Sequence, residues 1–366
     1  MKVKLTDVAE NIFAGGDVPK DRFSEVATDE YKIPIYANAE KDNGLYGYTD
    51  VARVLVPCVT VAARGTIGFT AKRTEPFLPV VRLITVIPNE EKITLDYLYY
   101  ALRNCRPKSS GTSIPQLTVP GIKNYFFKIT SISKQEEITR ILDEIEQLIE
   151  MQKKQINCYD WLIKSRFIEM FGDPVNNSFG FSEAILPELG VFGRGVSKHR
   201  PRNAPELLGG SYPVIQTGEV AAADLYITSY TNTYSELGFQ QSKMWDKGTL
   251  CITVAANIAK TAILGFDACF PDSIVGFNAN EKANNVFIHY WFSFFQTILE
   301  AQAPESAQKN INLKILSELK VIVPPIELQN KFAVFVHQVE KLKSEEQKRL
   351  EKTQTLFDSL MQKYFG

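Results

Sequence analysis

Two long stretches of the chain carry apolar residues at steps of three and four, the spacing of one face of an α-helix. They cover residues 134–172 and 326–366, and neither contains glycine or proline before its closing Phe-Gly. The pattern predicts two uninterrupted helices of about 37 residues, each about 55 Å long at 1.5 Å per residue. Neither helix is expected to be stable alone in water.

The apolar seams of these helices are expected to pair with each other as an antiparallel coiled coil. The predicted seam positions are Ile138, Ile141, Ile145, Leu148, Ile156, Ile163, Phe332, Phe335, Val339, Leu342, Leu350 and Phe357. An isolated helix pair would be interpreted as a dimerisation element only. Because each helix follows a globular region, a spacer between two domains is the better interpretation.

The two helical stretches belong to an internal duplication. Segment 308–366 overlays segment 114–172 at a constant offset of 194 without a gap, and Gln135 coincides with Gln329. The preceding regions correspond more weakly, with Thr60–Ala63 on Thr253–Ala256 at an offset of 193. Four segments are therefore predicted: a first domain over 1–133, a helix over 134–172, a second domain over 173–325 and a helix over 326–366.

Both globular regions contain apolar runs that are broken by small residues and Gly, which indicates strands. VLVPCVTVAARGTIGF lies at 54–69 and GTLCITVAANIAKTAILGF at 248–266. A short helix is expected after each sheet region, over Leu95–Arg103 and Val286–Ala301. The predicted fold class is α+β, with two β-rich globular domains alternating with two long helices in a pseudo-twofold internal duplication.

Composition excludes several classes of protein. The chain has 41 basic and 42 acidic residues, so its net charge of -1 shows no global nucleic-acid signature, and DNA binding would need local patches. Five cysteines without a C-x-x-C pair argue against a zinc site or a disulfide framework. The longest apolar stretch, Val286–Leu299, is too short to span a bilayer, and no signal peptide is recognisable, so a cytoplasmic location is expected.

Catalytic motifs are missing from the sequence. Phe192–Gly195 partly matches a glycine loop for S-adenosylmethionine but lacks the further Gly that such loops carry. Pro271-Asp272 could begin a nuclease motif, yet no acidic-x-Lys triplet follows it. No phosphate-binding G-x-x-x-x-G-K-[ST] loop occurs. With three scattered histidines as well, the sequence predicts a non-catalytic binding protein without a metal site.

Several local strings resemble the specificity (S) subunits of Type I restriction-modification systems. They are FGRGVSKHRPR at 192–202, YPVIQTGEV at 212–220, IYANAEKDNGLYGYTD at 35–50 and PPIELQNKF at 324–332. In the first copy of the duplication, SISKQEEI at 131–138 occupies the place that PPIELQNKF has in the second copy. There Thr130-Ser131 replaces the usual Pro pair. This departure is expected to alter only the turn from strand to helix.

The resemblance implies a function in DNA recognition. Each globular domain would be a target recognition domain that reads one half of a bipartite, asymmetric double-stranded DNA sequence, and the paired helices would set the gap between the halves. Two methyltransferase (M) subunits would dock on this chain and use S-adenosylmethionine to methylate adenine N6. Two motor-nuclease (R) subunits would supply ATP and Mg chemistry. This chain would bind no cofactor and supply no catalytic residue.

Candidate DNA contacts are polar residues that can reach base edges or phosphates. In the first domain they are Tyr36, Asn38, Lys41, Arg64, Thr66, Lys72 and Arg73. In the second domain they are Lys198, His199, Arg200, Arg202, Gln216, Thr217, Asn257 and Lys260. Structural roles remain open for several of them: Arg64 beside a glycine bulge could pair with a carboxylate, and Gln216 and Asn257 could satisfy buried backbone.

Two alternative functions also remain open. The chain could be the specificity module of a methylation-only system that has no motor subunit. It could also be a coiled-coil scaffold unrelated to DNA, for which the near-neutral net charge is the only positive argument.

Overall fold

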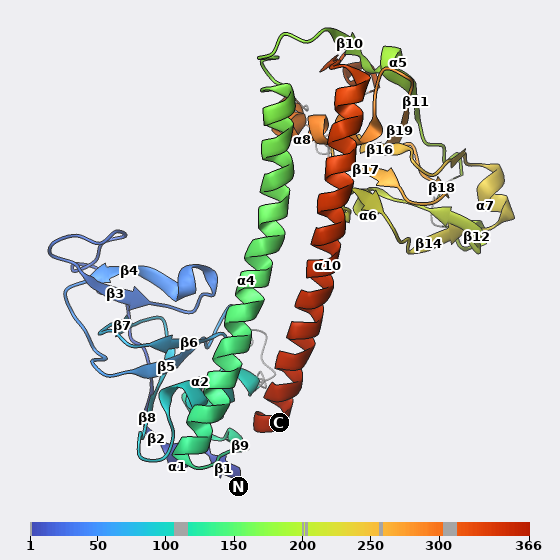
Figure 1. The fold of residues 1–366 in the computed structure, drawn as a ribbon. Coiled ribbons are helices and arrows are strands. Elements are labelled where there is room, and N and C mark those ends of the chain that lie inside the picture. Colours follow the sequence, from blue (N-terminus) through green and yellow to red (C-terminus); the bar gives the residue numbers. More distant parts are fainter. Residues whose placement is uncertain (1, 106–115, 200, 202–203, 256–258, 303–312) are drawn as a thin grey trace. The chain divides into compact units, whose positions relative to one another are not determined.

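The computed structural model describes residues 2–105, 116–199, 201, 204–255, 259–302 and 313–366 (Figure 1). The chain forms two compact units, one of residues 1–154 with 347–366 and one of residues 155–346. Each unit contains one globular region and a part of both long helices. The predicted fold class is confirmed, with two sheet-containing globular regions that alternate with two long helices.

The described residues of the first unit form three sheets. The strand β1 (Lys2–Lys4) pairs antiparallel with β9 (Phe126–Lys128). A four-stranded sheet has the order β2 (Ala9–Ala14), β8 (Ile84–Pro88), β5 (Cys58–Val61), β6 (Thr70–Arg73), and a three-stranded sheet has the order β4 (Leu45–Thr49), β3 (Ile33–Tyr36), β7 (Leu78–Pro79). The helical segments are α1 (Leu5–Val8), the 3₁₀ turn η1 (Lys41–Gly44), α2 (Leu95–Asn104) and α3 (Val119–Lys123).

The second unit repeats this plan. The strand β10 (Glu183–Ile185) pairs antiparallel with β20 (Lys320–Ile322). A five-stranded sheet has the order β11 (Gly190–Arg194), β19 (Ile274–Ala279), β16 (Leu250–Thr253), β17 (Thr261–Leu264), β13 (Tyr226–Ile227). A four-stranded sheet has the order β14 (Asn232–Tyr234), β12 (Leu208–Val214), β18 (Ala268–Cys269), β15 (Met244–Trp245). The helical segments are α5 (Leu186–Leu189), the 3₁₀ turn η2 (Pro205–Leu207), α6 (Thr217–Ala222), α7 (Glu236–Gln240), α8 (Asn285–Gln302) and α9 (Leu313–Ser317).

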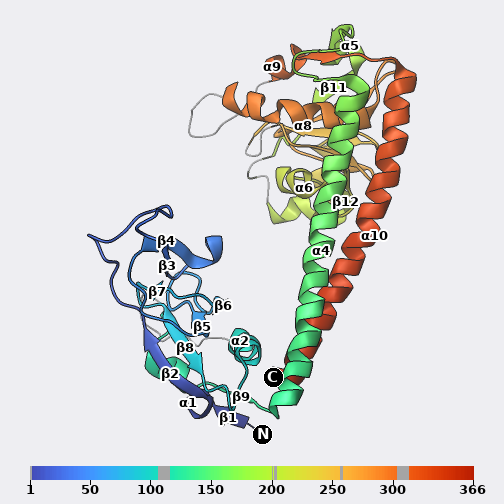
Figure 2. The same ribbon diagram turned by 60° about the vertical axis from the view of Figure 1, so that its left-hand side comes forward.

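The two long helices confirm the duplication at its predicted offset. Both α4 (Ile132–Phe171) and α10 (Ile326–Phe365) are 40 residues long, and their first and last residues are separated by the same 194 positions. In the first unit, Phe365 near the end of α10 belongs to the same buried hydrophobic cluster as Ile138 near the start of α4. In the second unit, Phe332 near the start of α10 contacts Phe167 near the end of α4. The helices therefore run antiparallel, as predicted (Figure 2).

The buried seam differs in part from the predicted heptads. Leu148 and Leu342 are 41% and 50% exposed, so their assignment to the seam was wrong. Leu142, Ile149 and Val336, which the prediction omitted, are buried. Each helix covers its own globular region as well as the other helix, so the buried stripe is wider than an a/d seam and follows the 3.6-residue period. The other predicted positions are buried (Ile138, Ile163, Phe332, Val339, Phe357) or half-buried (Ile141, Ile145, Ile156, Phe335, Leu350).

The strand correspondence between the copies also needs a correction. The backbone N–H of Ala62 donates to the carbonyl of Phe69 at 2.8 Å, and that of Thr253 donates to the carbonyl of Lys260 at 2.9 Å. These matching hydrogen bonds make Ala62 equivalent to Thr253, an offset of 191 where 193 was predicted. A shift of two residues keeps every side chain on the same sheet face, so the alternation of apolar residues could not detect it.

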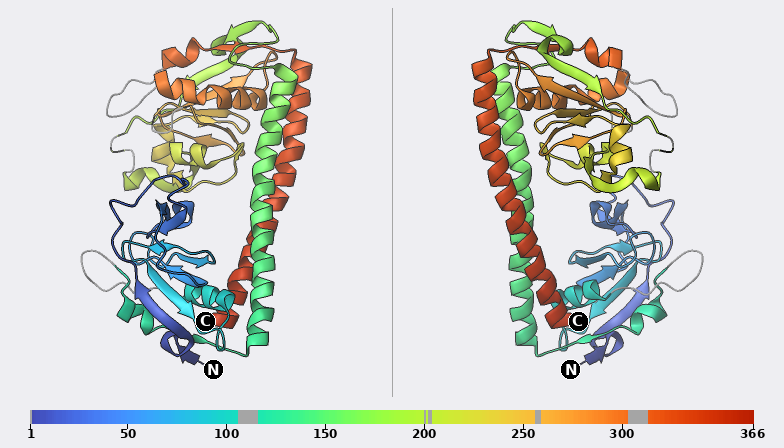
Figure 3. Two further views of the ribbon diagram at one scale, coloured as in Figure 1. Left: turned by 90° about the vertical axis from the view of Figure 1, so that its left-hand side faces the viewer. Right: turned by 90° about the vertical axis from the view of Figure 1, so that its right-hand side faces the viewer.

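Each unit has a separate hydrophobic core between its sheet and its helices. In the first unit, α2 packs on β5 and β6 and contributes the fully buried Tyr97 and Tyr100. In the second unit, α8 contributes Phe287 and Trp291. Figure 3 shows the blue and cyan strands of the first unit beside the N-terminal end of α4. In the described part of the chain, no helix combines the length and the apolar character that crossing a membrane requires.

Candidate nucleic-acid interface

A buried glutamine fixes each long helix to its globular domain in the same way. In α4, the side-chain oxygen of Gln135 accepts from the Thr94 N–H at 2.9 Å, and its amide donates to the carbonyls of Lys92 and Thr130. The side chain is fully buried. The amide therefore joins the loop before α2, the turn before α4 and α4 itself.

Gln329 repeats these three contacts in the second unit. Its side-chain oxygen accepts from the Asn284 N–H at 3.0 Å, and its amide donates to the carbonyls of Lys282 and Pro324. The turn before the helix contains Thr130 in one copy and Pro324 in the other, and the hydrogen bonds are nevertheless the same. The orientation of each domain on its helix thus depends on an equivalent buried side chain.

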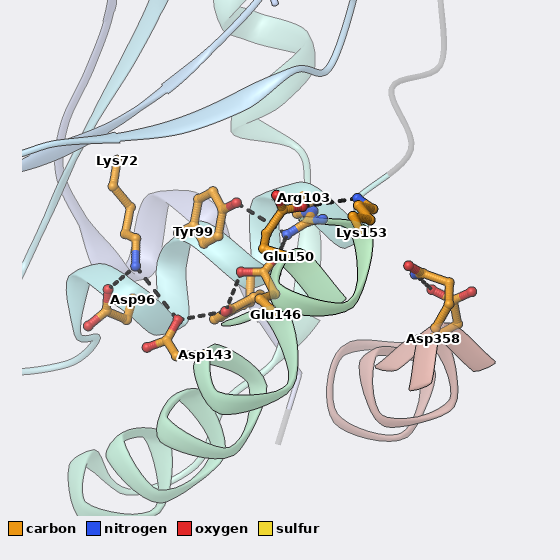
Figure 4. Close-up of polar contacts among 11 residues, drawn as sticks. Lys72, Asp96, Tyr99, Arg103, Asp143, Glu146, Glu150, Lys153 and Asp358 are labelled. Atoms are coloured by element: carbon orange, nitrogen blue, oxygen red, sulfur yellow. Dashed lines mark hydrogen bonds and ion pairs between the residues drawn. The ribbon is translucent and has the colours of Figure 1, made fainter. Parts of the chain in front are cut away.

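A polar cluster joins α2 to α4 in the first unit (Figure 4). The Lys72 ammonium lies 2.7 Å from Asp96 and 3.8 Å from Asp143. The Tyr100 hydroxyl lies within hydrogen-bond distance of carboxylate oxygens of both Asp143 and Glu146, at 2.6 and 2.8 Å. Burial, together with these two carboxylates, raises the pKa of Tyr100 well above its usual range. The predicted DNA contact Lys72 is therefore engaged in ion pairs within its own unit.

Two further candidates of the first domain are buried. The Arg73 side chain is 4% exposed, and it donates to Thr60 Oγ1 and to the carbonyl of Asn43. Its guanidinium lies 3.6 Å from the centre of the Tyr36 ring, and the Tyr36 hydroxyl donates to Glu75 at 2.8 Å. The polar groups of both side chains are thus used inside the domain. The strand alternation in the sequence did not reveal this burial, because these residues lie between two sheets.

The remaining candidates of the first domain lie on adjoining loops. The Asn38 side-chain oxygen accepts from the Ala63 N–H at 2.7 Å, which brings the loop after β3 against the loop after β5. Lys41, Arg64 and Thr66 are exposed on these two loops. The Arg64 guanidinium donates to Gln116 Oε1 at 2.9 Å. These loops therefore present two basic groups and a hydroxyl on one exposed region.

Sequence reasoning missed one basic residue of this region. Arg82 is exposed in the turn after β7, and the Asn38 amide donates to the carbonyl of the adjoining Val81. The residues Val80–Leu83 form an apolar run interrupted only by Arg82, without Gly, Asn or Pro, so the sequence contains no turn signal there. Only the hydrogen bonds of the folded domain reveal the turn.

In the second domain, the basic loop after β11 is only partly described. The backbone N–H groups of Lys198 and His199 both donate to Gln241 Oε1, at 2.6 and 3.0 Å. His199 Nε2 lies 3.8 Å from a Glu206 oxygen, and both Lys198 and His199 are exposed. The candidates Arg200, Arg202 and Asn257 lie outside the described residues.

Gln216 and Thr217 lie where α6 begins. The Gln216 backbone N–H donates to Glu219 Oε2 at 3.1 Å, while its side chain is exposed and Thr217 is half-buried. Lys260 is exposed, and its N–H donates to Thr253 Oγ1 at 3.1 Å. Because the Gln216 side chain is exposed, it does not satisfy buried backbone groups, which was the alternative role expected from the sequence.

A cavity of about 400 Å³ lies beside Lys260 in the second unit, between α6, α8 and the long helices. Its lining includes Asp224, His289 and Glu340. On α10, the nearly buried Lys343 ammonium lies 2.6 Å from Asp160 on α4 and 3.0 Å from Asp224. This ion-pair network links both long helices to the second domain. Among the described residues, no cluster of His, Cys, Asp and Glu is suitable for a metal ion.

Lowering the pH is expected to destabilise the second unit through His289. Burial lowers the pKa of this imidazole to about 4, although its Nδ1 contacts Thr261 Oγ1 at 2.9 Å. Because an unfolded imidazole has a pKa of about 6.5, the unfolded state binds more protons between these values, and stability falls as the pH falls. The expected contribution is a loss of about 2 kcal/mol in the free energy of unfolding between pH 7 and pH 5.

Denaturant unfolding followed by tryptophan fluorescence checks this expectation, because Trp161, Trp245 and Trp291 all lie in the second unit. In the H289Q variant, the difference in the free energy of unfolding between pH 7 and pH 5 should be much smaller. An equal pH dependence in both proteins would show that His289 is not the group responsible.

The cysteines agree with the expected absence of disulfides, because all five are free. Cys58, Cys251 and Cys269 are buried, and burial raises the pKa of the Cys58 thiol to about 12. Such thiols are packing groups and are poor nucleophiles.

The long helices expose large apolar side chains as well as burying them. On α4, Trp161 is 71% exposed and Met151 is 59% exposed, and on α10 the exposed apolar residues include Val334 and Leu356. Aromatic residues such as tryptophan are enriched at protein–protein interfaces.

Comparison with known proteins identifies the family. The model of the Type I restriction modification DNA specificity domain matches residues 1–158 and 192–352, which are most of the chain and both copies of the duplication. A predicted type I specificity subunit of Mycoplasma pneumoniae is 36% identical over 167 residues. That match covers 43% of this chain and 49% of the relative, so the chain spans about half the length of this relative.

Longer matches are more distant. A protein of Methanocaldococcus jannaschii, named as a type I restriction enzyme MjaX specificity subunit, is 23% identical over 320 residues, or 81% of this chain and 74% of the relative. The crystal structure of a Type I restriction-modification system S subunit from M. genitalium has the same fold, with a TM-score of 0.63 at 16% identity over 100% of this chain and 96% of that chain. The family model matches both halves of the duplication, and the chain therefore belongs to the family of Type I restriction-modification DNA specificity domains.

Proposed function

We propose that this chain is the DNA-recognition subunit of a Type I restriction-modification complex. The observation that carries the proposal is the match of the specificity-domain family to both copies of the duplication. Each copy combines a globular domain with exposed basic loops and a long helix fixed by an equivalent glutamine. Two such domains in one chain suit a DNA target with two different halves.

Each globular domain reads one half of the bipartite target in this proposal. Lys41, Arg64 and Thr66 supply the contacts of the first domain, and Lys198, His199, Gln216, Thr217 and Lys260 those of the second. Their hydrogen-bonding groups can reach base edges or phosphates. Tyr36, Asn38, Lys72 and Arg73 are assigned no DNA contact, because these side chains are buried or half-buried and their polar groups are engaged within the domain. Arg200, Arg202 and Asn257 remain predictions.

The paired long helices set the gap between the half-sites and dock the partner subunits. A helix of 40 residues is about 60 Å long, which is more than one turn of B-DNA. The exposed apolar side chains of α4 and α10, including Trp161, would be covered by two methyltransferase subunits. These partners would hold S-adenosylmethionine and methylate adenine N6, and two motor-nuclease subunits would use ATP and Mg. This chain would contribute recognition and no catalytic residue.

The test is single-molecule sequencing of host DNA with and without this gene, scored for N6-methyladenine. The proposal expects a two-part motif with a fixed unread gap that loses methylation when the gene is deleted. Unchanged methylation, with the methyltransferase gene demonstrably expressed, would contradict it. Salt-sensitive binding of the assembled complex to duplex DNA provides a second readout, because phosphate contacts release counterions.

A further inference from the structure

The turn at residues 80–83 has an unusual backbone for its sequence. The Leu83 N–H donates to the Val80 carbonyl at 3.0 Å, and both central residues have positive φ angles, 51° at Val81 and 64° at Arg82. Positive φ at both central positions is the signature of a type I′ turn, which strongly favours Asn-Gly. A β-branched residue with positive φ is a genuine outlier. This turn is therefore formed at an energetic cost.

The second copy makes the same connection without this strain. There the Ile274 N–H donates to the Pro271 carbonyl at 3.0 Å, so Asp272 and Ser273 occupy the positions equivalent to Val81 and Arg82. Neither Asp272 nor Ser273 has a positive φ. The fold can thus join these two strands by an ordinary turn, and the strained form is a property of the first domain.

Three hydrogen bonds from other segments hold the strained turn in place. The Val80 N–H donates to the Tyr36 carbonyl at 3.0 Å, and the Val81 N–H donates to the Gly16 carbonyl at 2.7 Å. The Asn38 amide donates to the Val81 carbonyl. The conformation is therefore specified by its surroundings, as is usual where strain is kept for function. Asn38 also accepts from the Ala63 N–H, so the same side chain places this turn beside the loop of Arg64.

From this arrangement we infer that Arg82 contacts DNA in the first half of the target and that Asn38 is its positioning residue. The inference rests on the proposed function. Arg82 is exposed, and among the described residues its side chain has no ion-pair or hydrogen-bond partner. Lys41 and Arg64 lie on the loops that Asn38 joins to this turn. A guanidinium can bind the O6 and N7 acceptors of guanine or two phosphate oxygens.

The R82G variant gives a direct test, because glycine relieves the positive φ while it removes the guanidinium. The complex with methyltransferase subunits is assembled with R82G, and its affinity is measured on a duplex that contains the motif found by sequencing. The expected result is a thermal midpoint that is equal or higher, together with DNA binding that is about 5- to 100-fold weaker. A stable variant with unchanged affinity and unchanged motif would overturn the inference.

Two further variants complete the design. R82K keeps the charge but cannot make a bidentate contact. If Arg82 binds a phosphate, R82K should have most of the DNA affinity that R82G loses. If Arg82 reads a base, the R82K complex should accept more than one base at one position of the first half-site. K123A removes an exposed charge on α3, which packs against α1 and β2, and should bind normally. If the unchanged complex shows no two-part motif at all, the proposed function fails, and this outcome is distinct from a failure of R82G alone.

Discussion

Replacing Gln329 by leucine is expected to lower the free energy of unfolding of the second unit by about 3 to 5 kcal/mol. The side chain is 1% exposed and satisfies three backbone groups: the N–H of Asn284 and the carbonyls of Lys282 and Pro324. Leucine has a similar size but leaves these groups without partners, and each unsatisfied buried group costs about 1 to 3 kcal/mol. Chemical denaturation followed by tryptophan fluorescence measures the effect.

The equivalent change in the other copy, Q135L, is the matched control. It removes the same three hydrogen bonds, but in the first unit, which contains no tryptophan. The fluorescence transition should therefore move much less than with Q329L, whereas circular dichroism should report destabilisation in both variants. A Q329L protein as stable as the unchanged chain would show that these hydrogen bonds do not hold the helix to its domain.

Adding one heptad to each long helix is expected to widen the unread gap of the DNA target while both half-sites stay the same. Suitable insertion points follow Lys154 and Lys348, which are equivalent in the duplication and lie close to the boundaries between the two units. Seven residues lengthen a helix by about 10.5 Å and change the phase of its buried face by only about 20°. This length corresponds to about three base pairs at 3.4 Å each.

Methylome sequencing of a strain that carries the lengthened chain measures the new gap. Its control is a chain in which one heptad of each helix is replaced by another of the same length and pattern, which should leave the gap unchanged. Methylation of the original motif by the lengthened chain would rule out the helices as the spacer. Complete loss of methylation is informative only together with evidence that the complex assembles, so its composition should be measured in parallel.

Much of the architecture could be predicted from the sequence because it depends on local periodicity. The steps of three and four between apolar residues located both long helices, and α4 begins at Ile132, two residues before the predicted boundary at 134. The offset of 194 required no structural information, because matching residues such as Gln135 and Gln329 align the two copies without a gap. The exposure of Leu148 and Leu342 could not be predicted in this way, because it depends on which faces the globular domains cover.

The candidate interface was less predictable than the fold. Arg73 and Lys72 have the same chemistry as exposed basic residues, and only their contacts with Tyr36, Asp96 and Asp143 show that they are engaged internally. Arg82 is the opposite case, because it is exposed but was not predicted as a DNA contact. It lies in an apolar run of the sequence, and the turn there is made by hydrogen bonds from distant segments. The sequence could thus suggest basic residues as DNA contacts from their chemistry alone. Whether each side chain is free to bind DNA depended on neighbours that are far away in the chain.

The sequence by itself determined the duplication, the two long helices and the β-rich character of both domains, because each of these follows from short-range periodicity and residue propensity. The tertiary structure alone decided the strand register between the copies and which polar side chains are free. Register shifts of two residues leave the pattern of buried and exposed positions unchanged. The partner of a polar group depends on chain segments that the fold brings together, such as those that meet at Gln135, Gln329 and Asn38.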